Sequence, residues 1–294
     1  MKKNKPSVLI TGSNGFVGQT LTKFLKDKHF TIIKISRKKN DLSKKNEFKK
    51  IFLKHNPNFI VHLAARTVSG IKNKKEDNIQ FKNTYLPIKN LVDNSNYCKN
   101  LKKIVFCGSI EEYGNIPLPY REKDKPKPIT SYGFAKYSAY KYLIDKSKKK
   151  NLNFVWLRPS LMFGQNDNAN RFLGSILFNL KQNKKVEINL GSQRRDFLYV
   201  QDFCNFIFYH IKFYKKFDYK LINISSGSWF YLRDLLKILK KKMSKKKFEL
   251  INIKRTNDKS IILNSNNLFK KIHPKFKFTP FMKSLKATLN SYGL

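Results

Sequence analysis

The sequence has few cysteines, few acidic residues and no long apolar run. Its three cysteines, Cys98, Cys107 and Cys204, are far apart and form no CxxC pair, which argues against a disulfide scaffold or a cysteine metal site. The five histidines show no metal-ligand spacing either. No apolar stretch approaches the ~18 residues that a membrane-spanning helix needs. The segment 1–6 is basic, but the apolar stretch that follows is too short for a signal sequence and leads into glycines. We therefore expect a cytoplasmic protein with no metal and no membrane partner.

Acidic residues are scarce relative to basic ones. Lys and Arg number 62 and Asp and Glu 19, which gives a formal net charge of +43. A charge of this size attracts polyanions and raises the question of a nucleic-acid partner. The lysines, however, are spread along the whole chain together with abundant Asn, Ile and Phe, as in an A/T-rich coding sequence. We interpret the charge as a solvated basic surface that favours nucleotide ligands, with nucleic acid an unlikely partner.

Apolar strands alternate with helical segments over the first half of the 294 residues. Strands are expected at 8–10, 31–36, 59–65, 104–107 and 154–157. A helix is expected from Asn78 to Asp93, although Pro87 interrupts its pattern. Beyond Leu161 the elements become shorter and more mixed. The alternation predicts an α/β fold of Rossmann type with a doubly wound parallel sheet.

The first strand runs into a glycine-rich turn that opens a helix. The turn reads Gly12-Ser13-Asn14-Gly15-Phe16-Val17-Gly18. In a strand–turn–helix context the glycines permit a tight turn, and backbone N–H groups at the helix start then face a pyrophosphate. We therefore predict that Gly12, Asn14, Gly15, Phe16, Val17 and Gly18 bind a dinucleotide.

The second strand ends without the acidic residue that binds the ribose hydroxyls of NAD, and Ser36 and Arg37 stand there instead. A carboxylate would repel a 2′-phosphate, whereas these two residues suit one. NADP is therefore the expected cofactor, with NAD the alternative. Asp41 and Leu42 open a helical pattern and are expected near the adenine, with an N-cap role for Asp41 the alternative. The small residues of Leu63-Ala64-Ala65 let a cofactor lie close to a strand end.

Tyr132 and Lys136 lie four residues apart in a segment of good helix formers, so one helical face carries both. A nearby ammonium favours the phenolate and lowers a phenol pKa from its usual ~10. The pair is thus suited to exchange a proton with a substrate oxygen. Ser109 follows the strand 104–107, where a catalytic hydroxyl is expected. A Tyr–Lys pair also arises by chance in a lysine-rich chain, so its meaning depends on the other motifs.

Six motifs occur in a fixed order along the chain. They are Gly12-x-x-Gly15-x-x-Gly18, Leu63-Ala64-Ala65, Ser109 four residues before Tyr113-Gly114, Tyr132-x-x-x-Lys136, Arg158-Pro159 and Arg195-Asp196-Phe197-x-Tyr199-Val200-x-Asp202. The ordered set resembles the extended short-chain dehydrogenase/reductase family of nucleotide-sugar epimerases, dehydratases and ketoreductases. The resemblance covers nearly the whole chain. It implies an NAD(P) cofactor, a nucleotide-sugar substrate and a homodimer.

The resemblance also assigns roles by position. Ser109 would hydrogen-bond the reacting oxygen of the sugar, Tyr132 would exchange a proton with it, and Lys136 would hold the nicotinamide ribose. The implied cofactor contacts further include Leu63, Ala64, Ala65, Asn83, Tyr132, Lys136 and Pro159. The implied substrate contacts are Glu111, Leu161, which replaces a usual asparagine, and Arg195, which would bind the diphosphate. Glu111 and its neighbour Glu112 are interpreted either as sugar-pocket acids or as structural acids.

The resemblance divides the chain into two domains. Residues 1–160, joined by 197–225, would bind NAD(P), and residues 161–196 and 226–294 would form a smaller α/β domain for the sugar nucleotide. Family dehydratases carry an Asp-Glu pair after the catalytic hydroxyl, and here Ile110 and Glu111 stand at those positions. Isoleucine cannot donate a proton, which argues against dehydration.

Three functions remain open at this point. The first is NADP(H)-dependent reduction of a nucleotide-linked 4-keto-6-deoxyhexose, in deoxysugar or surface-polysaccharide biosynthesis. The second is an NAD-dependent nucleotide-sugar 4-epimerase, which would use the same residues. The third, more remote, is a non-catalytic RNA-binding member of the fold.

Overall fold

The computed structural model describes residues 5–67, 73–169, 171–188, 193–216, 220–242, 250–252 and 261–294. The chain forms two compact units. The first comprises residues 1–116, 122–159 and 204–222, and the second comprises 117–121, 160–203 and 223–294. The sequence places its divisions after residues 160, 196 and 225. Which unit binds which ligand stays a prediction.

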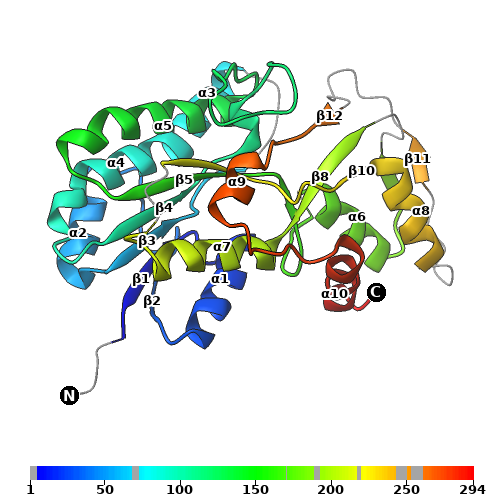
Figure 1. The fold of residues 1–294 in the computed structure, drawn as a ribbon, viewed down its shortest axis with the longest axis horizontal. Coiled ribbons are helices and arrows are strands. Elements are labelled where there is room, and N and C mark those ends of the chain that lie inside the picture. The colour runs from blue at the N-terminus through cyan, green and yellow to red at the C-terminus, as the bar shows by residue number, and fades with distance from the viewer. Residues whose placement is uncertain are drawn as a thin grey trace. The chain divides into compact units, whose positions relative to one another are not determined.

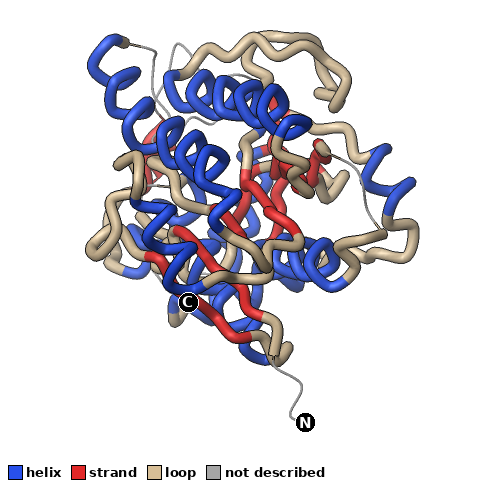
Figure 2. The backbone as a smooth tube through the Cα atoms, turned by 90° about the vertical axis from the view of Figure 1, so that its left-hand side faces the viewer, coloured by secondary structure: helices blue, strands red, loops and turns tan. Residues whose placement is uncertain are grey.

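The first unit is built on a six-stranded sheet. Its strands are β1 (Ser7–Thr11), β2 (Thr31–Ile35), β3 (Phe59–His62), β4 (Lys103–Cys107), β5 (Phe154–Pro159) and β9 (Leu221–Ile224), the last crossing the boundary between the units. The spatial order is β2-β1-β3-β4-β5-β9, and the pairings from β2 to β5 are parallel. Helices lie on both sides of these strands (Figures 1 and 2). This confirms the predicted Rossmann-type α/β fold.

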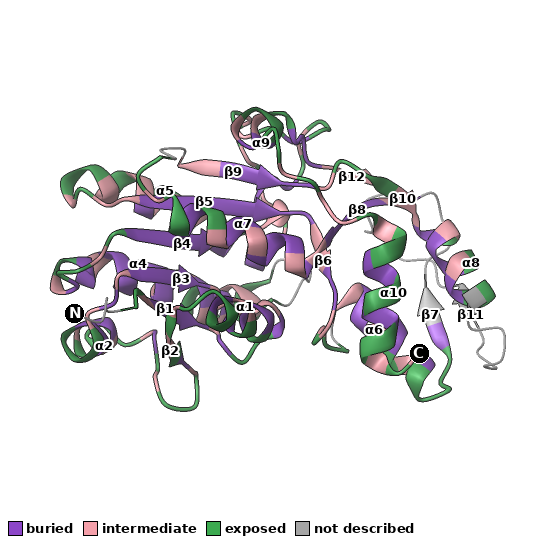
Figure 3. Ribbon diagram, turned by 60° about the horizontal axis from the view of Figure 1, so that its bottom comes forward, coloured by how far each residue is buried: buried purple, intermediate pink, exposed green. Residues whose placement is uncertain are grey.

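Each face of this sheet packs against its own helices. The helices are α1 (Phe16–Asp27), α2 (Glu47–His55), α3 (Lys74–Gln80), α4 (Leu86–Asn94), α5 (Ser131–Lys149) and α7 (Val200–Lys212). On one face, α2, α4 and α5 bury apolar side chains such as Phe52, Leu91 and Leu143 against Ile60 and Phe106. Strands β3, β4 and β5 are buried along most of their length (Figure 3). A strand buried on both faces reads as a continuous apolar run, which is why these strands were predictable.

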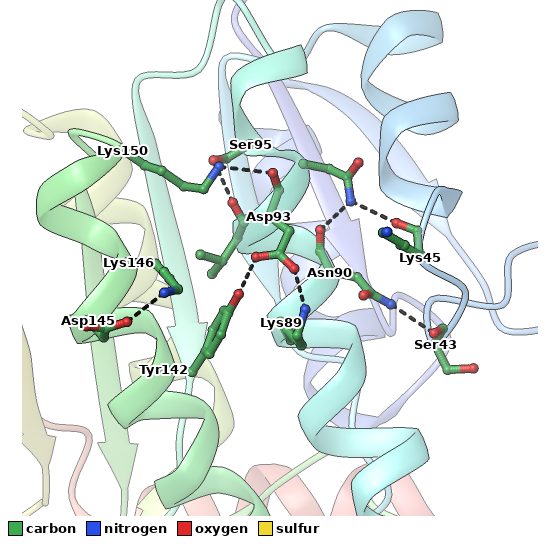
Figure 4. Close-up of polar contacts among 12 residues, drawn as sticks. Ser43, Lys45, Lys89, Asn90, Asp93, Ser95, Tyr142, Asp145, Lys146 and Lys150 are labelled. Carbon is green, nitrogen blue, oxygen red and sulfur yellow. Dashed lines mark hydrogen bonds and ion pairs between the residues drawn. The ribbon is translucent and has the colours of Figure 1, made fainter.

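A polar cluster joins α4, α5 and the loop after β2 (Figure 4). The Asp93 carboxylate on α4 accepts hydrogen bonds from the Tyr142 hydroxyl of α5 and from Lys89 Nζ. Lys150 Nζ donates to the Asp93 carbonyl over 3.0 Å. Asn90 Nδ2 donates to the carbonyls of Leu42 and Ser43, over 3.0 and 2.9 Å. These bonds fix α5, the helix that carries Tyr132, against the rest of the unit.

Helical structure over 78–93 is present but is not one regular helix. α3 ends at Gln80, a π-helical turn spans Phe81–Tyr85, and α4 then begins with Pro87 in its first turn. Proline has no N–H and crowds the preceding turn, and a π-helical turn changes the hydrogen-bond register just ahead of it. The helical pattern expected at Asp41 is wrong, because α2 begins only at Glu47.

The second unit contains smaller sheets and four further helices among its described residues. Its strands are β6 (Leu161–Phe163), β7 (Val186–Ile188), β8 (Arg194–Tyr199), β10 (Trp229–Tyr231), β11 (Leu250–Asn252) and β12 (Ile261–Ile262). Its helices are α6 (Phe172–Lys181), α8 (Leu232–Lys242), α9 (Asn267–Ile272) and α10 (Phe281–Tyr292). β8 pairs with β10, β12 and β6, and β7 pairs with β11. Apolar residues of α6, α8 and α10 pack with Phe163 and Phe197 to form its core.

Candidate active site

The glycine turn after β1 is packed too closely for larger side chains. Gly12 has φ +68°, and a Cβ there would lie 2.9 Å from the backbone nitrogen of Ala64. A Cβ on Gly18 would lie 2.2 Å from the Gly12 carbonyl oxygen. Gly15, the residue before α1, donates its N–H to the same carbonyl over 3.0 Å. The turn therefore brings the first N–H groups of α1 to the end of β1, a geometry that fits a pyrophosphate.

Small residues and a buried histidine shape the neighbouring ends of β1 and β3. Thr11 Oγ1 lies 3.0 Å from His62 Nδ1 and accepts hydrogen bonds from Leu63 N and Ala64 N, each over 3.2 Å. His62 is fully buried, and this burial, with the charge of Lys136, lowers its pKa to about 3. His62 is therefore a neutral packed residue. Its side chain supports the strand end on which Leu63 and Ala64 were predicted to contact the cofactor, together with Ala65.

The loop after β2 brings two predicted cofactor residues together. Arg37 Nη2 donates to Asn83 Oδ1 over 2.6 Å, and Asn83 Nδ2 donates to the Ile79 carbonyl over 2.7 Å. Asp41 accepts hydrogen bonds from Ser43 N and Ser43 Oγ, and the hydroxyl bond is the main reason that its pKa is lowered.

Asp41 therefore closes a local turn, and the N-cap alternative is wrong, because Asn46 precedes α2. Leu42 is buried in the apolar core, and Ser36 directly follows β2.

Tyr132 and Lys136 lie on the buried side of α5. Their exposed fractions are 7% and 1%, and Lys136 Nζ is 5.9 Å from the centroid of the Tyr132 ring. Lys136 Nζ donates a hydrogen bond to the Cys107 carbonyl over 2.6 Å. Burial lowers the pKa of Lys136, and the nearby Glu112 carboxylate acts in the opposite direction. The helix thus holds a cation beside a phenol in a place shielded from water.

Ser109 occupies the turn that joins β4 to a short 3-10 helix, Ile110–Glu112, which packs against α5. Its hydroxyl oxygen accepts from Glu111 N over 3.2 Å. The Glu111 carboxylate accepts from the Thr130 hydroxyl over 2.8 Å, and Thr130 in turn caps α5 by accepting from Gly133 N. This chain of bonds ties the Ser109 turn to the start of the helix that carries Tyr132.

Glu112 and Arg158 form a buried ion pair that sequence reasoning did not find. The Glu112 carboxylate accepts from Arg158 Nε at 2.8 Å, from Trp156 Nε1 at 2.9 Å and from Ser109 N at 2.7 Å. Both partners are 0–1% exposed, and the Arg158 guanidinium lies 4.5 Å from the Tyr113 ring centroid. Glu112 is therefore a structural acid. The signal in the sequence was an arginine at the end of an otherwise apolar strand, because a buried arginine requires a buried partner.

The remaining predicted residues belong to different parts of the chain. Pro159 ends β5 in the first unit. Leu161 begins β6 and Arg195 lies in β8, both in the second unit. Arg195 is 8% exposed and donates from Nη1 to the Arg194 carbonyl over 3.0 Å. The structure thus assembles the glycine turn, Ser109, Glu111, Tyr132 and Lys136 within one unit, and it places Leu161 and Arg195 in the other.

Comparison with known proteins agrees with this arrangement. Residues 8–225 match the NAD dependent epimerase/dehydratase family. The chain is 27% identical over 274 residues to the dTDP-4-dehydro-6-deoxyglucose reductase of Escherichia coli, covering 84% of each chain. It is 25% identical over 248 residues to a GDP-L-fucose synthase of Sinorhizobium fredii, covering 79% of this chain and 78% of that one.

Solved structures share the fold. The UDP-glucose 4-epimerase of Thermotoga maritima, solved with UDP-glucose, has a TM-score of 0.87 at 22% identity and 98% coverage of both chains. The RMD protein of Pseudomonas aeruginosa, complexed with NADPH, has a TM-score of 0.83 at 19% identity, covering 98% of this chain and 97% of that one. Within the part of the chain that the structure describes, no helix is both long and apolar enough to cross a membrane. The resemblance to extended short-chain dehydrogenases/reductases is confirmed, and the chain is an NAD(P)-dependent enzyme that belongs to the NAD-dependent epimerase/dehydratase family.

Proposed function

We propose that this enzyme reduces a nucleotide-linked 4-keto-6-deoxyhexose with NADPH. One observation carries the proposal. Tyr132 and Lys136 are buried side by side on α5, next to the Ser109 turn. Dehydratases of the family have a proton-donating acid directly after the catalytic hydroxyl residue, and this chain has Ile110 there. A site with a phenol, a cation and a hydroxyl, but no acid at that position, suits proton transfer to a carbonyl oxygen more than loss of water. The reductase from E. coli named above is a relative of matching length.

The residues of this chain have distinct tasks in such a reduction. Nicotinamide, when bound, supplies the hydride to the ketone carbon. Tyr132 gives its phenolic proton to the ketone oxygen, and the adjacent ammonium of Lys136 stabilises the phenolate that this leaves. The Ser109 hydroxyl donates a hydrogen bond that orients the same oxygen. A proton from solvent then restores Tyr132, so the net change is addition of one hydride and one proton to the carbonyl group.

The glycine turn and the end of β2 support the choice of cofactor. The close packing of Gly12 and Gly18 leaves the α1 N-terminus open to a pyrophosphate. Ser36 and Arg37 follow β2, and no carboxylate stands there to repel a 2′-phosphate. NADP is therefore proposed over NAD. The first unit would bind this cofactor, through the residues predicted from the sequence.

The second unit is proposed to bind the sugar nucleotide. Arg195 offers a planar fork of N–H donors, which matches the geometry of a diphosphate. Leu161 and, from the first unit, Glu111 are proposed to contact the sugar. Since the Glu111 carboxylate accepts a hydrogen bond from Thr130, its contact with a sugar hydroxyl would use its remaining acceptor capacity.

A homodimer is also proposed, through the helices around Tyr132. Phe134 on α5 is 47% exposed and Phe81 in the adjoining π-helical turn is 52% exposed. Large exposed aromatic side chains on neighbouring elements are typical of an interface between subunits. Sedimentation of the purified protein should give twice the 34.7 kDa mass of one chain. A monomer at micromolar concentration would contradict this proposal.

The function is tested by following NADPH oxidation with a panel of dTDP-, CDP-, GDP- and UDP-linked 4-keto-6-deoxyhexoses, with NADH in parallel. We expect stoichiometric NADPH consumption with one member of the panel, which also names the nucleotide. The alternative is a 4-epimerase, in which a retained NAD would take a hydride from one carbon and return it to the opposite face, while the same Ser, Tyr and Lys would remove and return the hydroxyl proton. No consumption with any ketosugar, together with NAD(H) released when the protein is denatured, would replace the reductase by this epimerase.

A further inference from the structure

The backbone of Ser109 is held on both sides by one residue, Glu112. The Ser109 N–H donates to Glu112 Oε1 over 2.7 Å, and the Ser109 carbonyl accepts from the Glu112 N–H over 3.2 Å. The Ser109 hydroxyl oxygen accepts from Glu111 N over 3.2 Å, which leaves the hydroxyl proton to donate to a substrate oxygen. Three hydrogen bonds therefore fix the direction of the side chain that is proposed to orient that oxygen.

The Glu112 carboxylate is anchored to β5 and is fully buried. Its Oε1 also accepts from Trp156 Nε1 over 2.9 Å, and its Oε2 accepts from Arg158 Nε over 2.8 Å. A Cβ on Gly108 would lie 2.5 Å from Glu112 Oε1 and 2.1 Å from Trp156 Nε1. The carboxylate thus reaches Ser109 N across a position that carries no side chain. It ties the Ser109 turn to the position of β5.

The segment that Glu112 holds also carries the hydrogen-bond partner of Lys136. Lys136 Nζ donates to the Cys107 carbonyl over 2.6 Å and lies 6.0 Å from the centroid of the Trp156 ring. Burial lowers the pKa of Lys136, while the Cys107 thiol and the Glu112 carboxylate act to raise it. The titratable groups around Lys136 are His62 on β3, Cys107 on β4, Glu112 in the 3-10 helix and Tyr132 on α5. Glu112 is the one carboxylate in this set.

Two buried cations share this carboxylate. Arg158 is bonded to it, and Lys136 is near enough for the carboxylate to raise its pKa, while both cations are 1% exposed. Arginine keeps its charge at any working pH, so loss of the carboxylate would favour loss of the lysine proton. A neutral lysine beside Tyr132 would no longer stabilise a phenolate. Glu112 therefore bears on the cation as well as on the hydroxyl of the proposed site.

We propose that Glu112 is a positioning residue of the reaction, which holds the Ser109 turn in place and supplies the negative charge that keeps Lys136 an ammonium ion. The inference rests on the proposed roles of Ser109, Tyr132 and Lys136. It applies to reduction and to 4-epimerisation alike, because both would use these three residues. In this role Glu112 needs no contact with the sugar or the cofactor. Its two effects are separable, because one depends on the length of the side chain and the other on its charge.

The test compares Glu112→Asp with Glu112→Gln in kcat and in its pH dependence. Glu112→Asp keeps the charge but is one methylene shorter, so it cannot reach Ser109 N and Arg158 together. Its kcat at pH 7 should fall about tenfold to 10²-fold, with the alkaline limb of the pH profile unchanged. Glu112→Gln keeps the length and loses the charge, so its alkaline limb should move to lower pH. The ratio of kcat at pH 9 to kcat at pH 7 should then be at least about fivefold below that of the wild type.

Asp202→Asn is the control for a general loss of stability. Asp202 is another buried carboxylate, in the second unit, and accepts from Thr279 N and Thr279 Oγ1 over 2.8 Å each. This variant should lower the free energy of unfolding but change kcat less than about twofold. Circular dichroism at the assay temperature checks that every variant is folded.

A second measurement does not depend on turnover. Carbon-13 NMR of protein labelled at lysine follows the titration of Lys136, whose signal is assigned by its loss in Lys136→Met. The signal should titrate at lower pH in Glu112→Gln than in the wild type, because the buried ammonium has lost its counter-charge.

The inference fails if both Glu112 variants keep kcat within about twofold of the wild type while losing stability, because Glu112 is then structural alone. It also fails if Asp202→Asn lowers kcat as much as they do, or if Lys136 titrates at the same pH in the wild type and in Glu112→Gln. A wild-type protein that converts no nucleotide sugar would instead refute the proposed function. The NMR titration would still decide whether Glu112 acts on Lys136.

Discussion

At the scale of single residues, the chemistry depends on a cation kept out of water. Lys136 is 1% exposed, and burial alone lowers its pKa. The Cys107 carbonyl accepts its proton at 2.6 Å and the Glu112 carboxylate acts to raise its pKa, so both favour the ammonium form. A charge in such surroundings acts on a neighbouring phenol more strongly than it would in water. The buried position of Lys136 therefore serves the proposed role of Tyr132.

Replacing Tyr132 with Phe removes the proton donor and keeps the ring. We expect kcat to fall about 10²-fold to 10⁴-fold, the usual contribution of a positioned acid. The dissociation constant for NADPH should change less than about threefold, because the glycine turn and the end of β2 are untouched. Steady-state kinetics and a fluorescence titration with NADPH measure the two effects. If the variant keeps more than a tenth of the wild-type turnover rate, Tyr132 is not the proton donor.

Replacing Glu112 with Gln tests the buried ion pair. The variant leaves the Arg158 guanidinium without its counter-charge at a site that is 0–1% exposed. We expect the free energy of unfolding to fall by roughly 3 kcal/mol, as when one partner of a buried pair is removed. Glu111→Gln is the matched control and should cost about 1 kcal/mol, because its hydrogen bond with Thr130 weakens and no buried ion pair is broken. If urea unfolding shows the same loss of unfolding free energy for both variants, the ion pair stabilises the fold no more than the single hydrogen bond does.

The sequence was informative about residues whose roles depend on local spacing. Tyr132 and Lys136 are one helical turn apart, so their shared face followed from the helix period alone. The roles of Glu111 and Glu112 could not be separated in this way, because they are adjacent and chemically identical. Their partners, Thr130 and Arg158, are 19 and 46 residues away, and only the folded chain shows which acid meets which partner.

At the scale of elements, the β1–turn–α1 unit sets the cofactor site. Gly18→Ala would place a Cβ 2.2 Å from the Gly12 carbonyl, so α1 must move away from the turn. We expect NADPH binding to weaken at least about tenfold, because the N–H groups at the start of α1 would no longer face the pyrophosphate. Gly15→Ala is the milder comparison, since its Cβ would lie 3.3 Å from the same oxygen. If calorimetry gives the two variants equal affinity, close packing at Gly18 does not position the site.

Helices and strands were predictable where the periodicity and composition of a segment agreed. They were less predictable where tertiary contacts determined the conformation of a segment. Strands β3, β4 and β5 are buried on both faces, and their continuous apolar runs predicted them. The loop after β2 was mistaken for the start of a helix. There Asp41 bonds to Ser43, and Asn90 of α4 binds the neighbouring carbonyls of Leu42 and Ser43, so this segment is held in turns by a distant helix.

At the scale of the whole molecule, two buried histidines make stability depend on pH. Burial lowers the pKa of His62 to about 3 and that of His273 to about 4, whereas an unfolded histidine titrates near 6.5. Between these values the unfolded chain binds protons that the folded protein does not, so stability falls as pH decreases from 6.5 toward 3. Each histidine contributes up to about 1.4 kcal/mol per pH unit. Asp167, whose burial raises its pKa to about 6, acts in the opposite sense between pH 6 and 4.

Urea unfolding at pH 7.5, 5.5 and 4.5 measures this dependence. We expect His62→Asn to show a shallower loss of stability at low pH than the wild type, whatever its stability at pH 7.5. His29→Asn, at an exposed position, is the control and should follow the wild-type curve. If His62→Asn and the wild type lose stability in parallel, His62 is not the group that takes up the proton.

Also at this scale, the net charge of +43 predicted a basic surface without showing where the charge gathers. Lys23, Lys26 and Lys34 are separated along the chain by other residues and by the end of α1. Only the packing of α1 beside the edge strand β2 brings them around one hollow. The general fold followed from ordered motifs, whereas this grouping of charges depends on the tertiary structure.

The most direct test of the central claim is the fate of the hydride. The enzyme would be given NADPH carrying deuterium at both C4 positions of the nicotinamide, together with the 4-keto-6-deoxyhexose that supports NADPH oxidation, and the product sugar would be examined by NMR and mass spectrometry. The account predicts one deuterium atom at C4 of the product, with an equal amount of oxidised cofactor, and product formation about 10²-fold to 10⁴-fold slower with Tyr132→Phe. A product formed without deuterium, or formed without an equal amount of oxidised cofactor, would contradict it.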